Sequence, residues 1–210
     1  MPYLDHAFHC CRAHVVGRHD QLRDIWTAIY TQAGCHALPE RRGVAAAGPC
    51  KRADIVVSQG LLEPPRWTDI MVTHPIVESG GIWSGCGAGA AVAAAEGQKK
   101  REYRAAADSH GALVVPLCVE SYGRWGKSAV SELRRLAKLR GERADAQATC
   151  DAEQVRSSSL SRWRRELSCC LMQGNALILL AAAPDSLGRP GRCHVAPAAA
   201  PTLSELLIDC

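Results

Sequence analysis

Two aspartates and a pair of lysines are the residues of this sequence best suited to chemistry. Asp54 and Asp69 each begin a short run of β-forming residues, and Lys99 and Lys100 follow in a lysine-rich segment. Two carboxylates can hold a hard divalent cation, which activates water and polarises a phosphate oxygen. An ammonium group can stabilise the charge that builds when a phosphodiester is attacked. This set of residues therefore indicates metal-dependent cleavage of nucleic acid.

A simpler interpretation of the same residues stays open. Asp54 and Asp69 can be ordinary strand-end residues that pair with Arg52 and Arg66, because exposed ion pairs are common and contribute only about 0–1 kcal/mol. The segment 99–101 can equally be a solvated basic face of a helix. Residues 99–166 hold fifteen Lys and Arg against nine Asp and Glu, within a net charge of +4. That excess fits a phosphate-binding surface as well as a solvated one.

The elements that must position these residues are predicted from periodicity and from turn residues. We expect helices over residues 20–34, 88–110, 128–140 and 160–182, and strands over 35–38, 54–58, 67–73 and 112–120. One Gly and two Pro separate the two aspartate-bearing strands, which predicts a hairpin that brings the two carboxylates together. The order of elements predicts an α/β fold with a small mixed β-sheet flanked by helices, an extra C-terminal helix and a poorly ordered tail.

Composition along the chain predicts its organisation and its compartment. We expect a His/Cys-rich segment over 1–18, a core over 19–140, a polar linker over 141–159, a helix over 160–182 and a tail over 183–210. The eleven cysteines are irregularly spaced and no signal peptide precedes them, which predicts a reducing compartment, nuclear or cytoplasmic, and not secretion. The longest apolar run is far shorter than the roughly 20 residues that span a bilayer, so no membrane partner is expected.

Several short motifs occur in an order that resembles a known family. They are Arg-Ala-Asp-Ile-Val at 52–56, Asp-Ile-Met-Val-Thr-His-Pro at 69–75, Glu-x-x-Lys-x-x-x-Tyr at 96–103 and the segment 116–126. Together they resemble the PD-(D/E)XK restriction-like endonuclease domain at the C-terminal end of LINE-type (non-LTR) retrotransposon reverse transcriptases. The segments 6–10, 18–24 and 163–175 resemble the flanks of that domain. The resemblance covers roughly residues 5–180.

The resemblance implies an endonuclease that nicks DNA and supplies the 3′ end from which the parent polyprotein primes reverse transcription. It implies Mg²⁺ or Mn²⁺ held by Asp54 and Asp69, with Glu40 as an additional ligand. DNA is the expected partner, together with the element RNA through the polyprotein. The other interpretations are an inactive nucleic-acid-binding remnant of the same fold and a repair or resolvase-type nuclease of the same superfamily.

This sequence also departs from the family pattern. Met71 stands where the strand motif often has a lysine, so the resemblance implies that Lys99, with Lys100 as the alternative, takes over that role. Ala53 stands where a proline usually precedes the first aspartate.

Two further sets of candidate residues lie outside the carboxylate site. His6 and Cys11 match the second half of a Cys-Cys-His-Cys zinc knuckle that the family places before the nuclease, although the two upstream cysteines are absent. Either the chain is a gene fragment that has lost those cysteines, or His9 and Cys10 substitute for them as Zn²⁺ ligands. Basic residues that we expect to contact DNA phosphates are Arg124, Lys127, Arg134, Arg135 and Lys138.

Overall fold

A computed structural model gives the fold of most of the chain. It describes Phe8 and residues 12–39, 53–60, 63–76, 87–147 and 151–183. Glu40, the predicted zinc residues His6 and Cys11, and the predicted tail from residue 184 onward lie outside the described residues. The elements are α2 (Arg12–Gln32), β1 (His36–Pro39), β2 (Ile55–Ser58), β3 (Arg66–Thr73), α3 (Ala90–Ser109), β4 (Leu113–Glu120), α4 (Lys127–Ala146) and α5 (Ala152–Ala182).

The strands form one mixed sheet in the order β1-β2-β3-β4. The first two pairings are antiparallel, and α3 provides the crossover that makes β3 and β4 parallel. The expected α/β fold with a small mixed sheet flanked by helices is confirmed. In the β2–β3 hairpin Ile55 is opposite Thr68, so the same register continued by one pair places Asp54 opposite Asp69.

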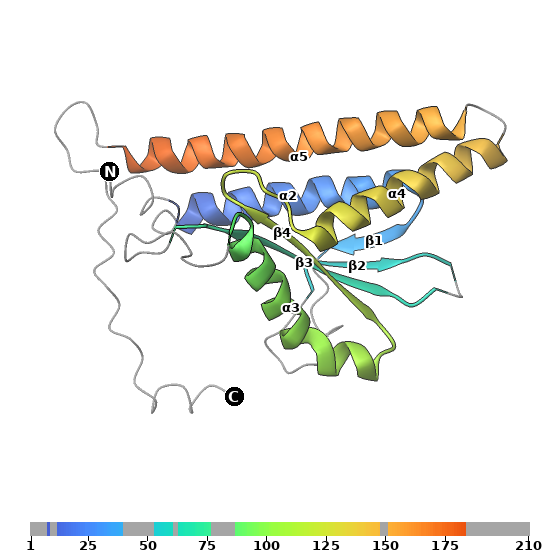
Figure 1. Cartoon of the computed structure of the whole chain (residues 1–210), viewed down its shortest axis with the longest axis horizontal. Helices are drawn as coiled ribbons and strands as arrows, with labels where there is room; N and C mark the ends of the chain where they lie inside the picture. Colours follow the sequence, from blue (N-terminus) through green and yellow to red (C-terminus); the bar gives the residue numbers. More distant parts are fainter. Residues whose placement is uncertain are drawn as a thin grey trace.

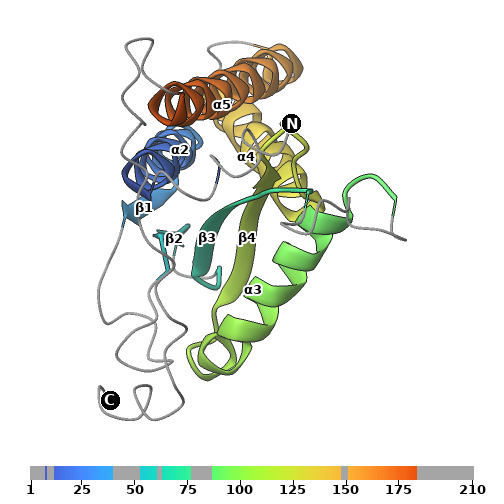
Figure 2. The ribbon, with the colours of Figure 1, turned by 90° about the vertical axis from the view of Figure 1, so that its left-hand side faces the viewer.

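The helices cover the two faces of the sheet unequally. Helices α2 and α4 lie on one face with α5 packed over them, and α3 lies alone on the other (Figures 1 and 2). The main hydrophobic core lies on the α2, α4 and α5 side, where Trp26, Leu117 and Trp163 are completely buried. Burying such side chains contributes about 1.5–3 kcal/mol each, so this side supplies most of the stability.

The α3 side of the sheet is built from small residues. Ala95, Ala106 and Ala107 are buried there, and Trp67 of β3 packs against Tyr103 and the last turns of the helix. Alanine has the highest helix propensity and lets the backbone approach the sheet closely. A thin helix layer therefore leaves the polar side chains of α3 near the strands.

The predicted linker over residues 141–159 is wrong. Helix α4 continues to Ala146, and α5 already begins at Ala152, where the Asp151 carboxylate accepts a hydrogen bond from the Glu153 N–H at 2.8 Å. The two helices touch at Gly141, where a Cβ atom would lie 2.6 Å from the Ala152 carbonyl oxygen. The polar composition of residues 141–146 and 152–159 reflects exposed helix surface, not an irregular connection.

The predicted boundaries at residues 18 and 160 also fall inside helices. Helix α2 begins at Arg12, and α5 extends eight residues further toward the N-terminus than expected. Trp163 and Leu167 of α5 belong to the same core as α2 and the sheet. The C-terminal helix is thus part of the core layer, because its apolar stripe has its partner in α2 and α4.

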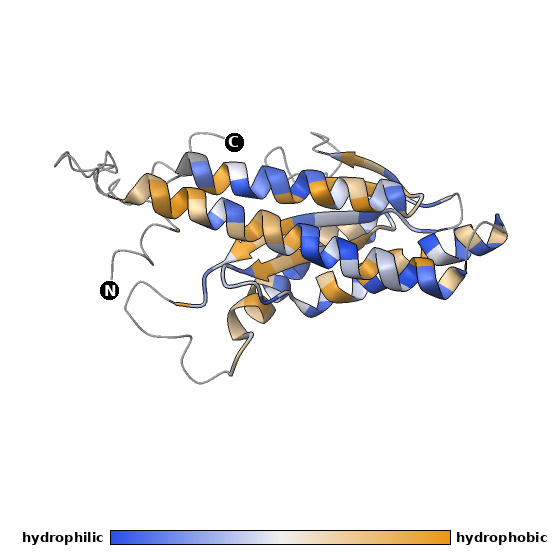
Figure 3. Cartoon of the chain, turned by 90° about the horizontal axis from the view of Figure 1, so that it is seen from above, coloured by the Kyte–Doolittle hydropathy of each residue, from blue (hydrophilic) through white to orange (hydrophobic). Residues whose placement is uncertain are grey.

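The start of α2 lies beside the end of α5 (Figure 1). Phe8 and Ile178 form one small apolar cluster there, and the last turns of α5 are its most hydrophobic part (Figure 3). Next to the cluster, the buried Arg18 donates a hydrogen bond to Asn175 Oδ1 at 2.6 Å. Within the described residues, no helix is both long and apolar enough to cross a membrane.

Candidate functional site

The two predicted aspartates meet on the α3 side of the β2–β3 hairpin. The Ile70 N–H donates to Asp54 Oδ2 at 2.7 Å, so Asp54 reaches across to the residue that follows Asp69. The Asp69 side chain is only 8% exposed, and that of Asp54 is 14% exposed. Burial raises the pKa of Asp69, and the nearby negative charge of Asp54 raises it further.

Lys99 is the cation of this cluster. Its Nζ lies 2.9 Å from Asp69 Oδ2 and 3.7 Å from Glu102 Oε2. Burial lowers the pKa of Lys99, but its attraction to Asp69 outweighs this effect and the net shift is upward. Lys99 is therefore a stable cation pointing from α3 toward the hairpin.

Tyr103 holds the other oxygen of Asp69. It lies one helical turn after Lys99, and its hydroxyl donates to Asp69 Oδ1 at 2.9 Å. Burial raises the pKa of Tyr103, and the Asp69 charge adds to the shift, so the phenol stays protonated and remains a donor. The spacing of four residues predicts that Lys99 and Tyr103 share a face, but it does not indicate the bond to Asp69.

His19 of α2 is a member of the site that sequence reasoning missed. Its Nε2 lies 3.1 Å from Asp54 Oδ2. The hydrogen bond with Asp54 raises the pKa of His19 against the opposing effect of burial. Nothing in the spacing of residues 19 and 54 indicates this contact, because it depends on how α2 crosses the end of β2.

Lys100, Met71 and Arg66 lie away from the two carboxylates. Lys100 points to the other flank of α3, beside the first residues of β4. Met71 packs against Val92 and its neighbours in the thin α3 layer. Arg66 lies 3.5 Å from Glu132 on the opposite face, so its pairing with the aspartates is wrong, and Arg52 lies outside the described residues.

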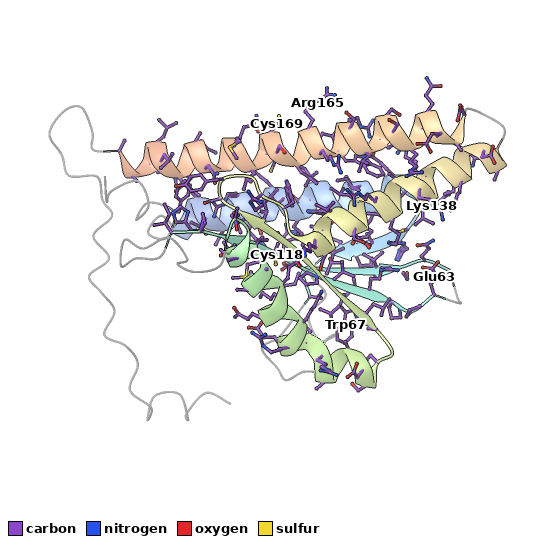
Figure 4. The ribbon with its side chains drawn as sticks, viewed as in Figure 1. Glu63, Trp67, Cys118, Lys138, Arg165 and Cys169 are labelled. Carbon is purple, nitrogen blue, oxygen red and sulfur yellow. The ribbon has the colours of Figure 1, made fainter. Side chains whose placement is uncertain are left out.

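The predicted DNA-contacting residues do not gather around the carboxylates. Arg135 donates to both oxygens of Glu132 and to Gln59 Oε1, so internal contacts use its guanidinium. Arg134 and Lys138 are exposed but belong to α4, on the far side of the sheet from α3, where Figure 4 shows Lys138. Arg124 and Lys127 are exposed at the connection between β4 and α4.

The donor set can be tested against the divalent cation that the resemblance implies. In the described part of the chain, no three His, Cys, Asp or Glu side chains are arranged to hold a metal ion, and Glu40 is outside it. The cluster holds the carboxylates of Asp54, Asp69 and Glu102 beside the ammonium of Lys99 and the imidazole of His19. The carboxylate oxygens of Asp54 and Asp69 are hard donors of the kind that Mg²⁺ or Mn²⁺ takes.

Comparison with known proteins adds nothing to this geometry. No protein-family model, no curated protein and no solved structure matches the chain. The assignment of a function rests on the residues and their arrangement.

Proposed function

We propose that this chain is a magnesium-dependent DNA endonuclease domain that nicks one strand. The observation that carries the proposal is the cluster on the α3 side, in which Asp54 and Asp69 adjoin and Lys99 Nζ lies 2.9 Å from Asp69 Oδ2. Two carboxylates and one lysine are the groups that a metal-assisted phosphodiester hydrolysis needs.

Each residue of the cluster would have a separate role in the reaction. Asp54 and Asp69 would hold Mg²⁺ or Mn²⁺, which supplies Lewis-acid activation of water and of the phosphate. The Ile70 N–H and His19 hold the Asp54 carboxylate in place, and Tyr103 does the same for Asp69. Lys99 carries a full positive charge beside the carboxylates and stabilises the charge that develops on the phosphate oxygens.

The biological setting is part of the same proposal. The order of motifs over roughly residues 5–180 supports a retroelement endonuclease whose nick provides the primer end for reverse transcription. DNA would be the substrate, and element RNA would be reached through the parent polyprotein. The place of action would be a reducing compartment, the nucleus or the cytoplasm.

One observation favours the alternative of an inactive nucleic-acid-binding remnant. Protein donors already satisfy both carboxylates, since Lys99 and Tyr103 contact Asp69 while Ile70 and His19 contact Asp54. A cluster of this kind is also stable without any metal. A measurement of nicking activity distinguishes the endonuclease from the inactive remnant.

The deciding experiment is a nicking assay. Supercoiled plasmid is incubated with the full chain and Mg²⁺ or Mn²⁺, and relaxation is followed over time. We expect Asp54→Ala and Asp69→Ala each to reduce nicking by at least about 100-fold, because each removes a group that acts directly on the reaction.

Glu142→Ala is the matched control for loss of a carboxylate. Glu142 lies on α4, on the far side of the sheet from α3, with its side chain 56% exposed, and it pairs only loosely with Lys138 at 3.6 Å. This variant should nick like the wild type. Equal nicking by all four proteins, or none by any, would refute the catalytic role.

A further inference from the structure

A groove runs along the flank of α3 that faces away from the carboxylate cluster. It has a volume of about 330 Å³ and lies between the second half of α3 and the first residues of β4. Strand β4 ends the sheet, so the groove opens at a sheet edge. Its lining consists of Lys100, Arg101, Arg104, Ala107, Asp108, Ala112, Leu113 and Val114.

The wall formed by α3 is strongly basic. Lys100, Arg101 and Arg104 contribute three positive charges against the single carboxylate of Asp108. Arg104 is 82% exposed and lies 3.9 Å from Asp108, so this pair is weak and solvated. Among the described residues, Lys100 and Arg101 form no ion pair, which leaves their charges available to an anion.

The floor of the groove is apolar. Ala112, Leu113 and Val114 provide it, and Leu113 is 44% exposed although it is a large hydrophobic residue. A phosphate alone would use only the basic wall. A ligand with phosphates on one side and a flat apolar surface on the other would use both.

We propose that this groove binds a single-stranded segment of the nucleic acid, with its phosphates against Lys100 and Arg104 and an unstacked base over Leu113. In a duplex the base faces are stacked within the helix, so a duplex presents mainly phosphates to such a surface. A single strand exposes its bases, and arginine planes and apolar side chains can receive them. The identity of the strand as DNA rests on the proposed endonuclease function.

The geometry of α3 links this groove to the cluster of Asp54 and Asp69. Successive residues of an α-helix are turned by about 100°, so Lys99 points to Asp69 while Lys100 points to the groove. Helix α3 thus lies between the carboxylate cluster, which would cleave the phosphodiester, and the groove, which would bind the single-stranded DNA. The segment bound in the groove would flank the cut.

The test is the affinity for a fluorescein-labelled 20-nucleotide DNA, measured by fluorescence anisotropy in EDTA, as a single strand and as the matching duplex. The variants are the double replacement Lys100→Ala with Arg104→Ala, and Leu113→Ser. We expect the double variant to bind the single strand roughly tenfold more weakly. A plot of the logarithm of the binding constant against the logarithm of the salt concentration should become less steep by about 1.4, which is about 0.7 for each lost phosphate contact. We expect Leu113→Ser to weaken binding of the single strand and to leave duplex binding unchanged.

The matched control removes two exposed charges from α5, on the other side of the sheet, by Arg164→Ala with Arg165→Ala. If this control binds the single-stranded DNA as tightly as the wild type, the groove is supported. If its affinity falls as much as that of the groove variant, the groove is overturned. Equal loss for single strand and duplex in Leu113→Ser overturns the single-strand assignment. Because EDTA removes cleavage from the measurement, strand binding without nicking would refute the endonuclease proposal alone, and nicking with unchanged binding by the groove variants would refute the groove alone.

Discussion

Two buried carboxylates, one on each face of the sheet, have opposite charge environments. Glu132 of α4 accepts hydrogen bonds from Tyr30 and Arg135 and lies 3.5 Å from Arg66, so two cations surround one anion. Asp69 on the α3 side has one cation, Lys99, and a second carboxylate beside it. The anion of the first arrangement is completely paired, whereas the second sets two carboxylates side by side, with Lys99 and His19 as their partners. Like charges held this close, which folding alone does not favour, distinguish a candidate functional site from a structural network.

The largest effect should come from breaking the complete network. Glu132→Ala leaves Arg66 and Arg135 without their acid partner, and we expect it to lower the free energy of unfolding by about 3 kcal/mol. Denaturant titration measures this change. Glu142→Ala, on the exposed side of the same helix, is the control and should change stability by less than about 1 kcal/mol. The comparison fails if both variants lose the same stability.

The second effect should separate two neighbouring lysines. Lys99→Met keeps the length of the side chain and removes the charge beside Asp69, so we expect nicking to fall by about 100- to 1000-fold. Lys100→Met removes a charge from the other flank of the helix and should reduce nicking by less than about tenfold. A larger loss in Lys100→Met would move the catalytic lysine by one position and contradict the geometry.

The smallest effect concerns stability on the α3 side. The pKa of Asp69 is raised in the folded chain, so folding favours its protonated form and the wild type loses stability as pH rises through that raised pKa. Asp69→Asn removes this loss. In EDTA we expect the variant to be at least as stable as the wild type at pH 7, in contrast to its loss of nicking. Thermal unfolding at pH 4 and pH 7 measures this, and a variant less stable at both values would show that Asp69 is a purely structural residue.

The sequence predicted the mixed sheet, the hairpin and the face of α3 that Lys99 shares with Tyr103, because these depend on local periodicity and on spacing within one element. It missed His19, whose contact with Asp54 spans 35 residues and depends on the packing of α2. It also assigned a linker to a polar stretch that is helical, because exposed helices and loops share the same composition. Arg135 was counted among DNA-contacting residues, since its internal partners Glu132 and Gln59 become visible only when α4 is placed against the sheet.

Phe8 and Ile178 lie near the two ends of the described fold and belong to one apolar cluster. The described fold has its first and last packed residues in contact, so its two ends occupy one corner of the molecule. Inserting such a unit into a loop of a host protein separates the loop ends by little, and the entropy of closing the host loop changes only slowly with added length. The fold is therefore suited to act as a modular insert, carried by a larger chain without stretching it.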